Sequence, residues 1–360
     1  MRKVLTLELV RITKKFPRFT LGPIDLKIEN NKILVIIGPT GGGKSSILSL
    51  IAGILKPDPG SILMDGLDIT NLPVHLRRIG FTFQNPSLFP HLNAYDNIVF
   101  GLKRTKKEND LQIRKLLEDL GISHISYRNT EGLSGGEMQK ISLARILVTN
   151  PKIMLMDEPL AHLDLPTKRN MRLELRRILV SRGVPSIYVT HFEDDVYALA
   201  DYVSILQDGT IKYADRLESI LSDQNENRFP FVSSMFNETN YLEGEVLQSN
   251  AGITTFSIAS HTIEIPGDYA IGSRVGILVE PEDIILSRNV IRTSARNMVK
   301  AKITKIINGN GGVIDVHLNV DRIQIVSRIT AEARRDLRLE EDDSILAVFK
   351  ASSPQIIREG

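Results

Sequence analysis

Cysteine is absent from the 360 residues of this chain, which excludes disulfides and thiolate metal sites. Excess charge is also small, because 45 basic and 43 acidic residues leave a formal net charge of +2. Such a balance argues against a nucleic-acid partner. Long apolar runs are missing too: Ile33–Ile37 falls far short of the roughly 20 residues that a membrane helix needs. We therefore expect the chain to stay outside the bilayer, and its alternating start, which carries Glu8, to be a strand rather than a signal peptide.

The length favours two domains, because 360 residues exceed one ordinary core. In the first part of the chain, Ile33–Ile37, Ile153–Met156 and Val184–Thr190 are typical of buried parallel strands. Pro166 and Gly183 fit the start and the end of a helix that precedes the last of them. This alternation of strands and helices predicts an α/β domain with a largely parallel sheet.

A polar, asparagine-rich stretch without a clear period, residues 222–240, separates this part from the rest. We place the boundary inside it, so that one domain spans residues 1–232 and the second spans residues 233–360. The change from mixed strands and helices to short strands supports this position.

The second part has a duplicated pattern of alternating strands and glycine turns. Asn240–Val246 is similar in type to Asn297–Ile303, and the stretch that begins at Gly276 is similar to the one that begins at Leu346. A repeated set of short strands predicts an all-β, OB-like tandem barrel.

Gly38 to Ser45 reads GPTGGGKS and fits G-x-x-x-x-G-K-[ST] at every fixed position. Its glycines let backbone N–H groups converge on phosphate oxygens, while Lys44 can reach the β- and γ-phosphates of ATP and Ser45 offers a hydroxyl to Mg²⁺. The alternative is a plain glycine-rich turn, which the strand before it and the amphipathic helix after it disfavour. The expected nucleotide-binding residues here are Gly38, Pro39, Thr40, Gly41, Gly42, Gly43, Lys44, Ser45 and Ser46.

Asp157 and Glu158 end the predicted strand at Ile153–Met156. Beside a phosphate loop, the first carboxylate is expected to contact Mg²⁺, usually through water, and the second to act as general base on the attacking water. An acidic pair that only caps a strand is the alternative, and the phosphate loop upstream makes the catalytic interpretation the stronger one.

A second glycine-rich helix start, LSGGE at Leu133 to Glu137, raises the question of what a second anion site is for. With the phosphate loop before it, Gln84 between them and His191 after it, this motif resembles the signature of ATP-binding-cassette (ABC) ATPases. The resemblance implies a Q-loop glutamine at Gln84 that contacts Mg²⁺, and a switch histidine at His191 that touches the γ-phosphate. It also implies a D-loop at Leu160–Asp164. Lys44, Gln84, Glu158 and His191 are then the catalytic residues, and Ser45, Gln84 and Asp157 the metal ligands.

The adenine-binding aromatic is expected at Phe16, by the same resemblance, although an isolated Phe is also a common core residue. The signature residues Ser134, Gly135, Gly136 and Glu137 lie at a helix start, where N–H groups and the helix dipole favour an anion. In cassette ATPases that anion is the γ-phosphate bound by the other subunit, and Asp164 of the D-loop lies beside it. The resemblance therefore implies a head-to-tail homodimer with two shared ATP sites.

The type of cassette protein follows from what the chain does not contain. It has no fused membrane helices, which are typical of cassette exporters, and no long insertion between Gln84 and the signature, which is typical of the DNA-repair relatives. It has one phosphate loop, whereas translation-type relatives commonly have two. An importer ATPase remains, bound peripherally at the cytoplasmic face to a two-copy membrane permease and served indirectly by an extracytoplasmic solute-binding protein. The family's permease would dock near Phe89, Pro90, His91 and Tyr95, which are equally consistent with an edge of the core.

Three positions depart from the usual pattern of importer ATPases. His162 replaces a small residue, Lys140 replaces an arginine, and Phe192-Glu193 replaces Asp-Gln after the switch histidine. None of them removes an expected phosphate or Mg²⁺ contact, so they affect only the fine details of dimer coupling.

The tail resembles the oxyanion-binding (TOBE/Mop-like) modules of molybdate- and tungstate-handling proteins, through Thr293–Ile303 and Phe349–Ser353. A tetrahedral dianion needs converging hydroxyls, N–H groups and a cation. By the family pattern these would come from Ser294, Arg296, Thr330, Lys350 and Ser352. The resemblance implies molybdate or tungstate import with feedback inhibition by the bound oxyanion.

Other interpretations of the tail remain open. The barrel could only join two subunits, as in importers of sugar or ferric iron, or the transported ion could be sulfate. Outside transport, the chain could be a cytosolic oxyanion sensor or store whose cassette is a dimerisation switch. The filled set of hydrolytic positions argues against that last class.

Overall fold

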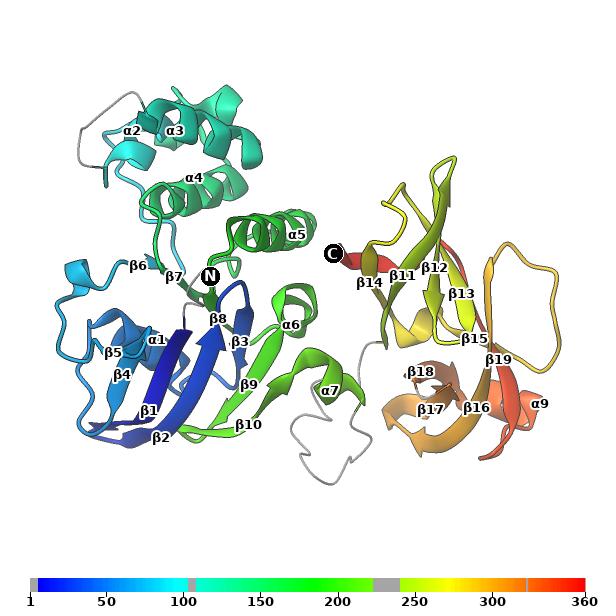
Figure 1. Ribbon diagram of the computed structural model, residues 1–360. Helices are drawn as coiled ribbons and strands as arrows, with labels where there is room; N and C mark the ends of the chain where they lie inside the picture. The colour runs from blue at the N-terminus through cyan, green and yellow to red at the C-terminus, as the bar shows by residue number, and fades with distance from the viewer. Residues whose placement is uncertain (1–5, 103–107, 223–239, 322, 360) are drawn as a thin grey trace. The chain divides into compact units, whose positions relative to one another are not determined.

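The computed structural model describes residues 6–102, 108–222, 240–321 and 323–359. The chain divides into two compact units, Met1–Leu217 and Glu218–Gly360, which are described separately below (Figure 1). The boundary expected between residues 232 and 233 lies outside the described residues, so it stays a prediction.

A six-stranded sheet forms the centre of the first unit, and four of its five strand pairings are parallel. In spatial order its strands are β10 (Thr210–Arg216), β9 (Tyr202–Gln207), β3 (Ile33–Ile37), β8 (Ser186–Thr190), β7 (Ile153–Asp157) and β6 (Ile79–Thr82). The central strands β3 and β8 are buried along their whole length, as their uninterrupted apolar or small residues predict. The expected buried strands are therefore confirmed.

A second, antiparallel sheet packs in the same unit. In spatial order its strands are β2 (Phe19–Glu29), β1 (Thr6–Phe16), β4 (Ser61–Met64) and β5 (Leu67–Asp68). Strand β1 contains Glu8, which confirms the strand expected at the start of the chain. Buried residues of both sheets share one apolar cluster with helix α1 (Lys44–Ala52).

Further helices follow the strands of the first unit. They are α2 (Ala94–Val99), α3 (Glu108–Asp119), α4 (Gly135–Leu147), α5 (Leu165–Arg182) and α6 (Glu193–Leu199), with short 3₁₀ turns η1 (Val74–Leu76), η2 (Ser123–Ile125) and η3 (Thr130–Gly132). Helix α7 (Leu217–Ser222) begins at the last residue of this unit and continues in the second. Pro166 lies in the first turn of α5, and Gly183 ends this helix with a φ of 64°. No helix in the described part of the chain is long and apolar enough to cross a membrane.

The second unit is built from two five-stranded antiparallel sheets. The first contains β13 (His261–Pro266), β12 (Ile253–Ile258), β11 (Asn240–Asn250), β14 (Arg274–Val279) and β20 (Gln355–Glu359) in that spatial order. The second contains β18 (Ile323–Thr330), β17 (Val313–Val320), β16 (Asn297–Asn308), β19 (Ser344–Phe349) and β15 (Ile285–Ser287). Shorter elements are η4 (Pro281–Asp283), η5 (Asn310–Gly312) and α9 (Ala331–Leu337).

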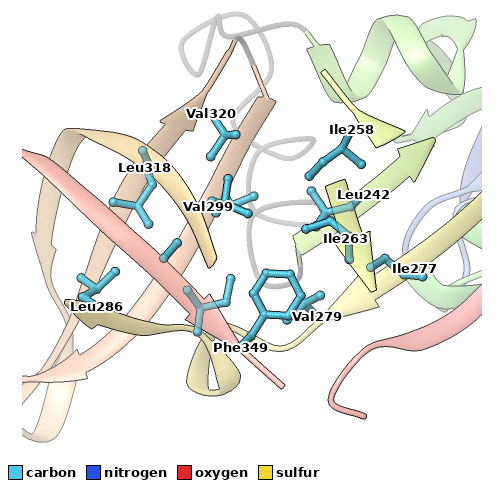
Figure 2. Packing of buried hydrophobic residues seen from close by; sticks show 14 of the residues in the cluster. Leu242, Ile258, Ile263, Ile277, Val279, Leu286, Val299, Leu318, Val320 and Phe349 are labelled. Carbon is cyan, nitrogen blue, oxygen red and sulfur yellow. The ribbon is translucent and has the colours of Figure 1, made fainter. Parts of the chain in front are cut away.

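The two sheets have the same strand order, which confirms the duplication that the sequence predicts. Their last strands are exchanged: β15 follows the first repeat but pairs in the second sheet, whereas β20 follows the second repeat and pairs in the first. Buried residues of both repeats form one apolar cluster, in which Leu242 and Ile263 come from the first and Val299 and Leu318 from the second (Figure 2). Each repeat therefore depends on the other for a strand and for its core.

Two buried asparagines connect the repeats at equivalent positions. The Asn240 side chain accepts from Val326 N–H and donates to Val326 C=O and to Val279 C=O. The Asn297 side chain accepts from Glu264 N–H and donates to Glu264 C=O. Because a primary amide both donates and accepts, each asparagine satisfies the free edge of a strand in the opposite repeat.

Candidate functional site: a phosphate loop and a second helix start

The expected phosphate loop connects β3 to α1 and has the backbone that its glycines permit. Gly41 and Gly43 have φ values of 81° and 100°, a region that favours glycine. A Cβ on Gly38 would lie 2.0 Å from the carbonyl oxygen of Leu206 on β9, so only glycine fits there. Pro39 and Thr40 are exposed at the tip of the loop. The loop is thus pinned at its base and open at its tip.

Lys44 lies in the mouth of this loop and is buried. Its Nζ donates to the carbonyl oxygens of Gly38 at 2.7 Å and Pro39 at 3.0 Å. Burial lowers the pKa of the ammonium, and the carboxylates of Glu158 and Asp157 oppose this shift. The side chain is therefore positioned in advance beside the backbone that would surround the phosphates.

Ser45 and Asp157 are in direct contact, since the serine hydroxyl donates to the carboxylate over 3.0 Å. Burial raises the pKa of Asp157, the Ser45 hydrogen bond opposes the shift, and nearby Glu158 adds to it. One hydroxyl and one carboxylate fit Mg²⁺, which usually completes its shell with phosphate oxygens and water. The described residues hold no cluster of three acidic or histidine ligands that would serve a metal by itself.

Glu158 and His191 also meet, because β7 and β8 are parallel neighbours and both residues follow the ends of these strands. The Nδ1 atom of His191 lies 3.0 Å from Oε1 of Glu158. Glu158 has a φ of 43°, and its N–H donates to Val189 C=O. This left-handed backbone turns the carboxylate out of the strand and toward the imidazole.

Gln84 and Phe16 are placed less directly. Gln84 is exposed two residues beyond the end of β6, which pairs with β7, so it follows the same edge of the sheet as Asp157. Phe16 ends β1 and stacks on Phe19 with ring centroids 5.8 Å apart. Phe19 in turn lies 3.0 Å from where a Cβ of Gly43 would stand. The Phe16 ring therefore packs on the core and lies one ring away from the phosphate loop.

The signature forms a second, separate group at the start of α4. Ser134 is the N-cap in a capping box, in which its hydroxyl accepts from Glu137 N–H and its N–H donates to the Glu137 carboxylate. The backbone hydrogen bond from Ser134 lowers the pKa of Glu137 more than any other contact. The N–H groups of Gly135 and Gly136 lie in the first turn, where a helix offers donors to an anion.

The D-loop lies against this helix start. Asp164 is the N-cap of α5 and accepts from Thr167 N–H at 3.2 Å. Gly135 and Gly136 approach Leu163 and Thr167 so closely that a Cβ would stand 3.3 Å and 2.9 Å from their side chains. The structure therefore brings the signature and D-loop residues together, while Lys44, Asp157 and Glu158 gather at the sheet edge.

Sequence reasoning missed a buried network that holds the turn carrying His191. Asp195 accepts from Thr190 Oγ1 at 2.7 Å, from Tyr188 Oη at 3.1 Å and from Arg172 Nε at 2.7 Å. The Thr190 hydroxyl in turn accepts from the N–H of Phe192. A signal was present in the paired acids of THFEDD, because one acid of a pair beside a buried strand often points inward.

In the second unit, four of the five expected oxyanion residues lie near one end of a strand pair. Asn297, the first residue of β16, pairs with Phe349, the last residue of β19. Arg296 and Lys350 are therefore the next residues outward on the two chains, and Ser294 and Ser352 are two residues further out. Arg296 forms an ion pair with Glu264, with Nε 3.0 Å from Oε2, and this contact raises the pKa of the guanidinium.

Thr330, the fifth expected residue, caps α9 by accepting from Ala333 N–H. It pairs with Val313 at the start of β17. The start of β17 pairs with the carboxyl end of β16, whereas Arg296 precedes the amino end of β16. The strand register thus separates Thr330 from the other four along the sheet.

Comparison with known proteins decides the family. The ABC transporter family model matches residues 21–161, and the TOBE domain model matches residues 293–353. A molybdate/tungstate import ATP-binding protein, WtpC of Pyrococcus horikoshii, is 35% identical over 96% of this chain and 98% of its own length. The chain belongs to the ATP-binding subunits of ABC importers. It therefore binds ATP and couples ATP hydrolysis to transport through a membrane permease, as the resemblance of its motifs predicts.

Relatives named for other substrates are nearly as similar. A spermidine/putrescine import ATP-binding protein of Acetivibrio thermocellus is 33% identical over 85% of this chain and 85% of its own length. A sulfate/thiosulfate import ATP-binding protein of Vibrio cholerae is 37% identical over 67% of this chain and 65% of its own length. Family membership alone thus leaves the transported species open.

Solved cassettes share the fold of the first unit. An ATP-binding cassette of an ABC transporter in its ADP conformation is 28% identical, with a TM-score of 0.55, over 61% of this chain and 96% of its own length. CbiO1 of Clostridium perfringens, part of an ABC transporter complex, is 26% identical, with a TM-score of 0.56, over 64% of this chain. Both the predicted cassette fold and the β-rich tail are confirmed.

One buried side chain, Asn97, holds the segment that is expected to receive the importer's permease through hydrogen bonds to its backbone. Asn97 accepts from Phe89 N–H and donates to the carbonyl oxygens of Phe89, Leu92 and Asn93. Arg145 covers the Phe89 ring from 5.3 Å, and Phe100 packs against it with centroids 4.3 Å apart. Phe89 is thus partly a core residue, and permease contact there stays a prediction.

Two of the three departures from the importer pattern have structural partners. Lys140 donates to Leu120 C=O at 3.0 Å and lies 2.7 Å from the Glu174 carboxylate, so it joins α4 to α5. The Phe192 ring lies tilted against His191 with centroids 3.9 Å apart, and the Lys168 ammonium lies 4.3 Å from the centroid of the Phe192 ring. His162 is exposed in the D-loop.

Proposed function

We propose that this importer subunit hydrolyses ATP to drive uptake of molybdate or tungstate through a separate, two-copy membrane permease. The observation that carries the hydrolytic part is the convergence of Lys44, Ser45, Asp157, Glu158 and His191 at one sheet edge. The anion class rests on the WtpC relatives, which align with nearly the whole chain, tail included.

Each residue has a defined task in this proposal. The loop glycines and Lys44 bind the phosphates, and Phe16 stacks near the adenine. Ser45 and Asp157, with Gln84, would hold Mg²⁺, which neutralises charge on the phosphates. Glu158 accepts a proton from the attacking water as its oxygen bonds to the γ-phosphorus and the bond to the ADP oxygen breaks. His191, held against Glu158, orients that carboxylate and contacts the γ-phosphate.

The signature supplies the remaining electrostatic stabilisation in the proposal. Developing charge on a transferred phosphoryl group needs donors on several sides, and the first-turn N–H groups of α4 are such donors. They belong to a group distinct from the sheet-edge residues, which supports a head-to-tail homodimer with ATP bound between unlike surfaces. The subunit would lie at the cytoplasmic face of the membrane, with a solute-binding protein outside supplying the anion.

One experiment separates the hydrolytic proposal from the anion assignment. Phosphate release by the purified chain is measured with and without its reconstituted permease, while molybdate, tungstate and sulfate are titrated in turn. We expect turnover that rises with the permease and falls as molybdate or tungstate is added, with sulfate weaker. A rate of ATP turnover that none of the three anions changes contradicts the feedback proposal, and absence of turnover contradicts the hydrolytic proposal.

Polyamine or sulfate import is the second candidate. It is favoured by the Arg296–Glu264 ion pair, which occupies the expected anion ligand, and by relatives of nearly equal similarity. Calorimetry of the full chain with the three anions and with spermidine distinguishes the candidates, because only the first predicts tight molybdate or tungstate binding.

A further inference from the structure

The signature glycines pack against the start of α5 within the same subunit. Gly136 faces Thr167: a Cβ on the glycine would stand 2.9 Å from Cγ2 of the threonine. Gly135 faces Leu163, where the corresponding distance to Cδ2 is 3.3 Å. Carbon atoms in contact prefer about 3.5 to 4.0 Å, so the first of these distances leaves no room for a methyl group.

Backbone conformation does not explain why position 136 is glycine. The residue lies inside the helical range of α4 with an ordinary helical φ, which any amino acid adopts. Inside a helix, glycine costs about 1 kcal/mol relative to alanine. Space is therefore the local reason for the glycine, and the atom that takes the space is the Thr167 methyl group.

Thr167 cannot easily turn its methyl group away. Its backbone N–H donates to the Asp164 carboxylate at 3.2 Å, which fixes the backbone of Thr167 in the first turn of α5. Threonine is also β-branched, so few χ1 rotamers are open to it in a helix. About one turn past Gly136 in α4 and about two turns past Thr167 in α5, Lys140 and Glu174 join the two helices with atoms 2.7 Å apart. The two helices are thus in contact at their starts and joined again by this ion pair.

We propose that Thr167 is a positioning residue for hydrolysis, whose methyl group sets the separation between the signature helix start and the D-loop. This inference rests on the proposed function, in which both elements contact one nucleotide bound by the partner subunit. Gly136 is required because it lets α4 approach Thr167. Signature and D-loop then move as one surface when the subunits close.

A competing explanation is that Gly136 only lets its own N–H reach the phosphate. The two explanations differ in which second substitution restores the activity that Gly136→Ala removes. Removal of the Thr167 methyl group makes room for the new one if packing is the cause. It leaves the defect unchanged if direct approach to phosphate is the cause.

The test is a double-mutant cycle on the full-length chain, with ATP turnover and binding of a fluorescent ATP analogue as readouts. Gly136→Ala should lower kcat about tenfold or more while nucleotide affinity changes less than about threefold, because the phosphate loop is untouched. Gly136→Ala combined with Thr167→Ser should recover at least about fivefold relative to Thr167→Ser alone. Thr167→Val, which keeps a methyl group and loses the hydroxyl, is the matched control and should not restore turnover.

Every outcome decides the question. Equal losses from Gly136→Ala in the Thr and Ser backgrounds overturn the inference, as does full activity of Gly136→Ala alone. If Gly136→Ala unfolds, thermal unfolding of the same set replaces turnover, and Ser but not Val at position 167 must restore the folded state. A wild-type chain that does not hydrolyse ATP would instead contradict the proposed function, which keeps the two failures apart.

Discussion

Charged side chains at the sheet edge of the first unit and two arginines of the second unit are in opposite situations. At the sheet edge of the first unit, burial lowers the pKa of Lys44 and raises the pKa of Asp157, so it favours the neutral form of each side chain. In the second unit, by contrast, Arg296 and Arg328 are paired with carboxylates, and the pKa of each guanidinium is raised. The charges at this sheet edge are only partly compensated, whereas the two arginines of the second unit are already paired.

This difference indicates that the sheet edge is arranged for binding and chemistry, whereas the paired arginines are held in structural contacts. A buried, imperfectly compensated charge costs free energy that a nucleotide and its metal can return on binding. A satisfied ion pair at the surface contributes little to stability and must be opened before it can bind an anion. The following variants test this contrast.

Replacement of Glu158 by glutamine should have the largest effect. Glutamine keeps the size of the side chain but cannot accept the proton from water, so kcat for ATP should fall about 10²- to 10⁴-fold. Binding of a fluorescent ATP analogue should persist, because the contacts of the phosphate loop remain. Glu29→Gln, an exposed glutamate on β2, is the matched control and should retain turnover. A Glu158→Gln chain with normal kcat would exclude this residue as the base.

Sequence predicted that the side chains of the sheet edge would lie together, because each of them follows a local rule, and their roles in hydrolysis stay a prediction. A buried apolar strand, then glycines, then Lys44 specify a phosphate loop, and Asp157-Glu158 at the end of another such strand specify the acidic pair. Parallel neighbours in one sheet bring these ends together without further information. The fold class was predictable for the same reason, since strand and helix periods are local.

Contacts between distant elements could not be predicted in this way. The exchange of β15 and β20 depends on which of two similar strands completes each sheet, and both have compatible patterns. The Arg296–Glu264 pair needs the register between the repeats, which no single segment contains. The Gly136–Thr167 contact likewise depends on how α4 crosses α5.

The buried asparagines should give the largest stability effect in the second unit. Asn297→Ala leaves the Glu264 N–H without its side-chain acceptor in a site that is 1% exposed, which costs about 1 to 3 kcal/mol. Asn240→Ala should cost a similar amount, because it removes the equivalent contact with Val326. Urea unfolding of the full chain measures both, with the exposed Asn289→Ala as control. Unequal losses would show that the repeats are not energetically equivalent.

The carboxylate of Asp157 should be a source of instability in the absence of nucleotide. Its folded pKa is raised above the ordinary value, so its contribution favours folding below that ordinary pKa and is lost as pH rises through the folded pKa. Asp157→Asn should therefore raise the unfolding temperature at pH 7 and lose this advantage in acid. Asp58, whose pKa is lowered by hydrogen bonds from Lys14 and Lys15, is the opposite case. Asp58→Asn should destabilise at pH 7, and a change of unfolding temperature with the same sign in both variants would contradict the opposite pKa shifts of Asp157 and Asp58.

The smallest effect on stability is expected at Arg296, yet it decides what the second unit does. The side chain is 65% exposed, so Arg296→Ala should leave the free energy of unfolding nearly unchanged. Anion binding should respond in opposite directions to the two partners: Arg296→Ala removes a cation, whereas Glu264→Gln frees it from its ion pair. Calorimetry with molybdate should then show weaker binding in the first variant and tighter binding in the second. If both variants bind molybdate as the wild type does, Arg296 is a structural partner of Glu264 and not an oxyanion ligand.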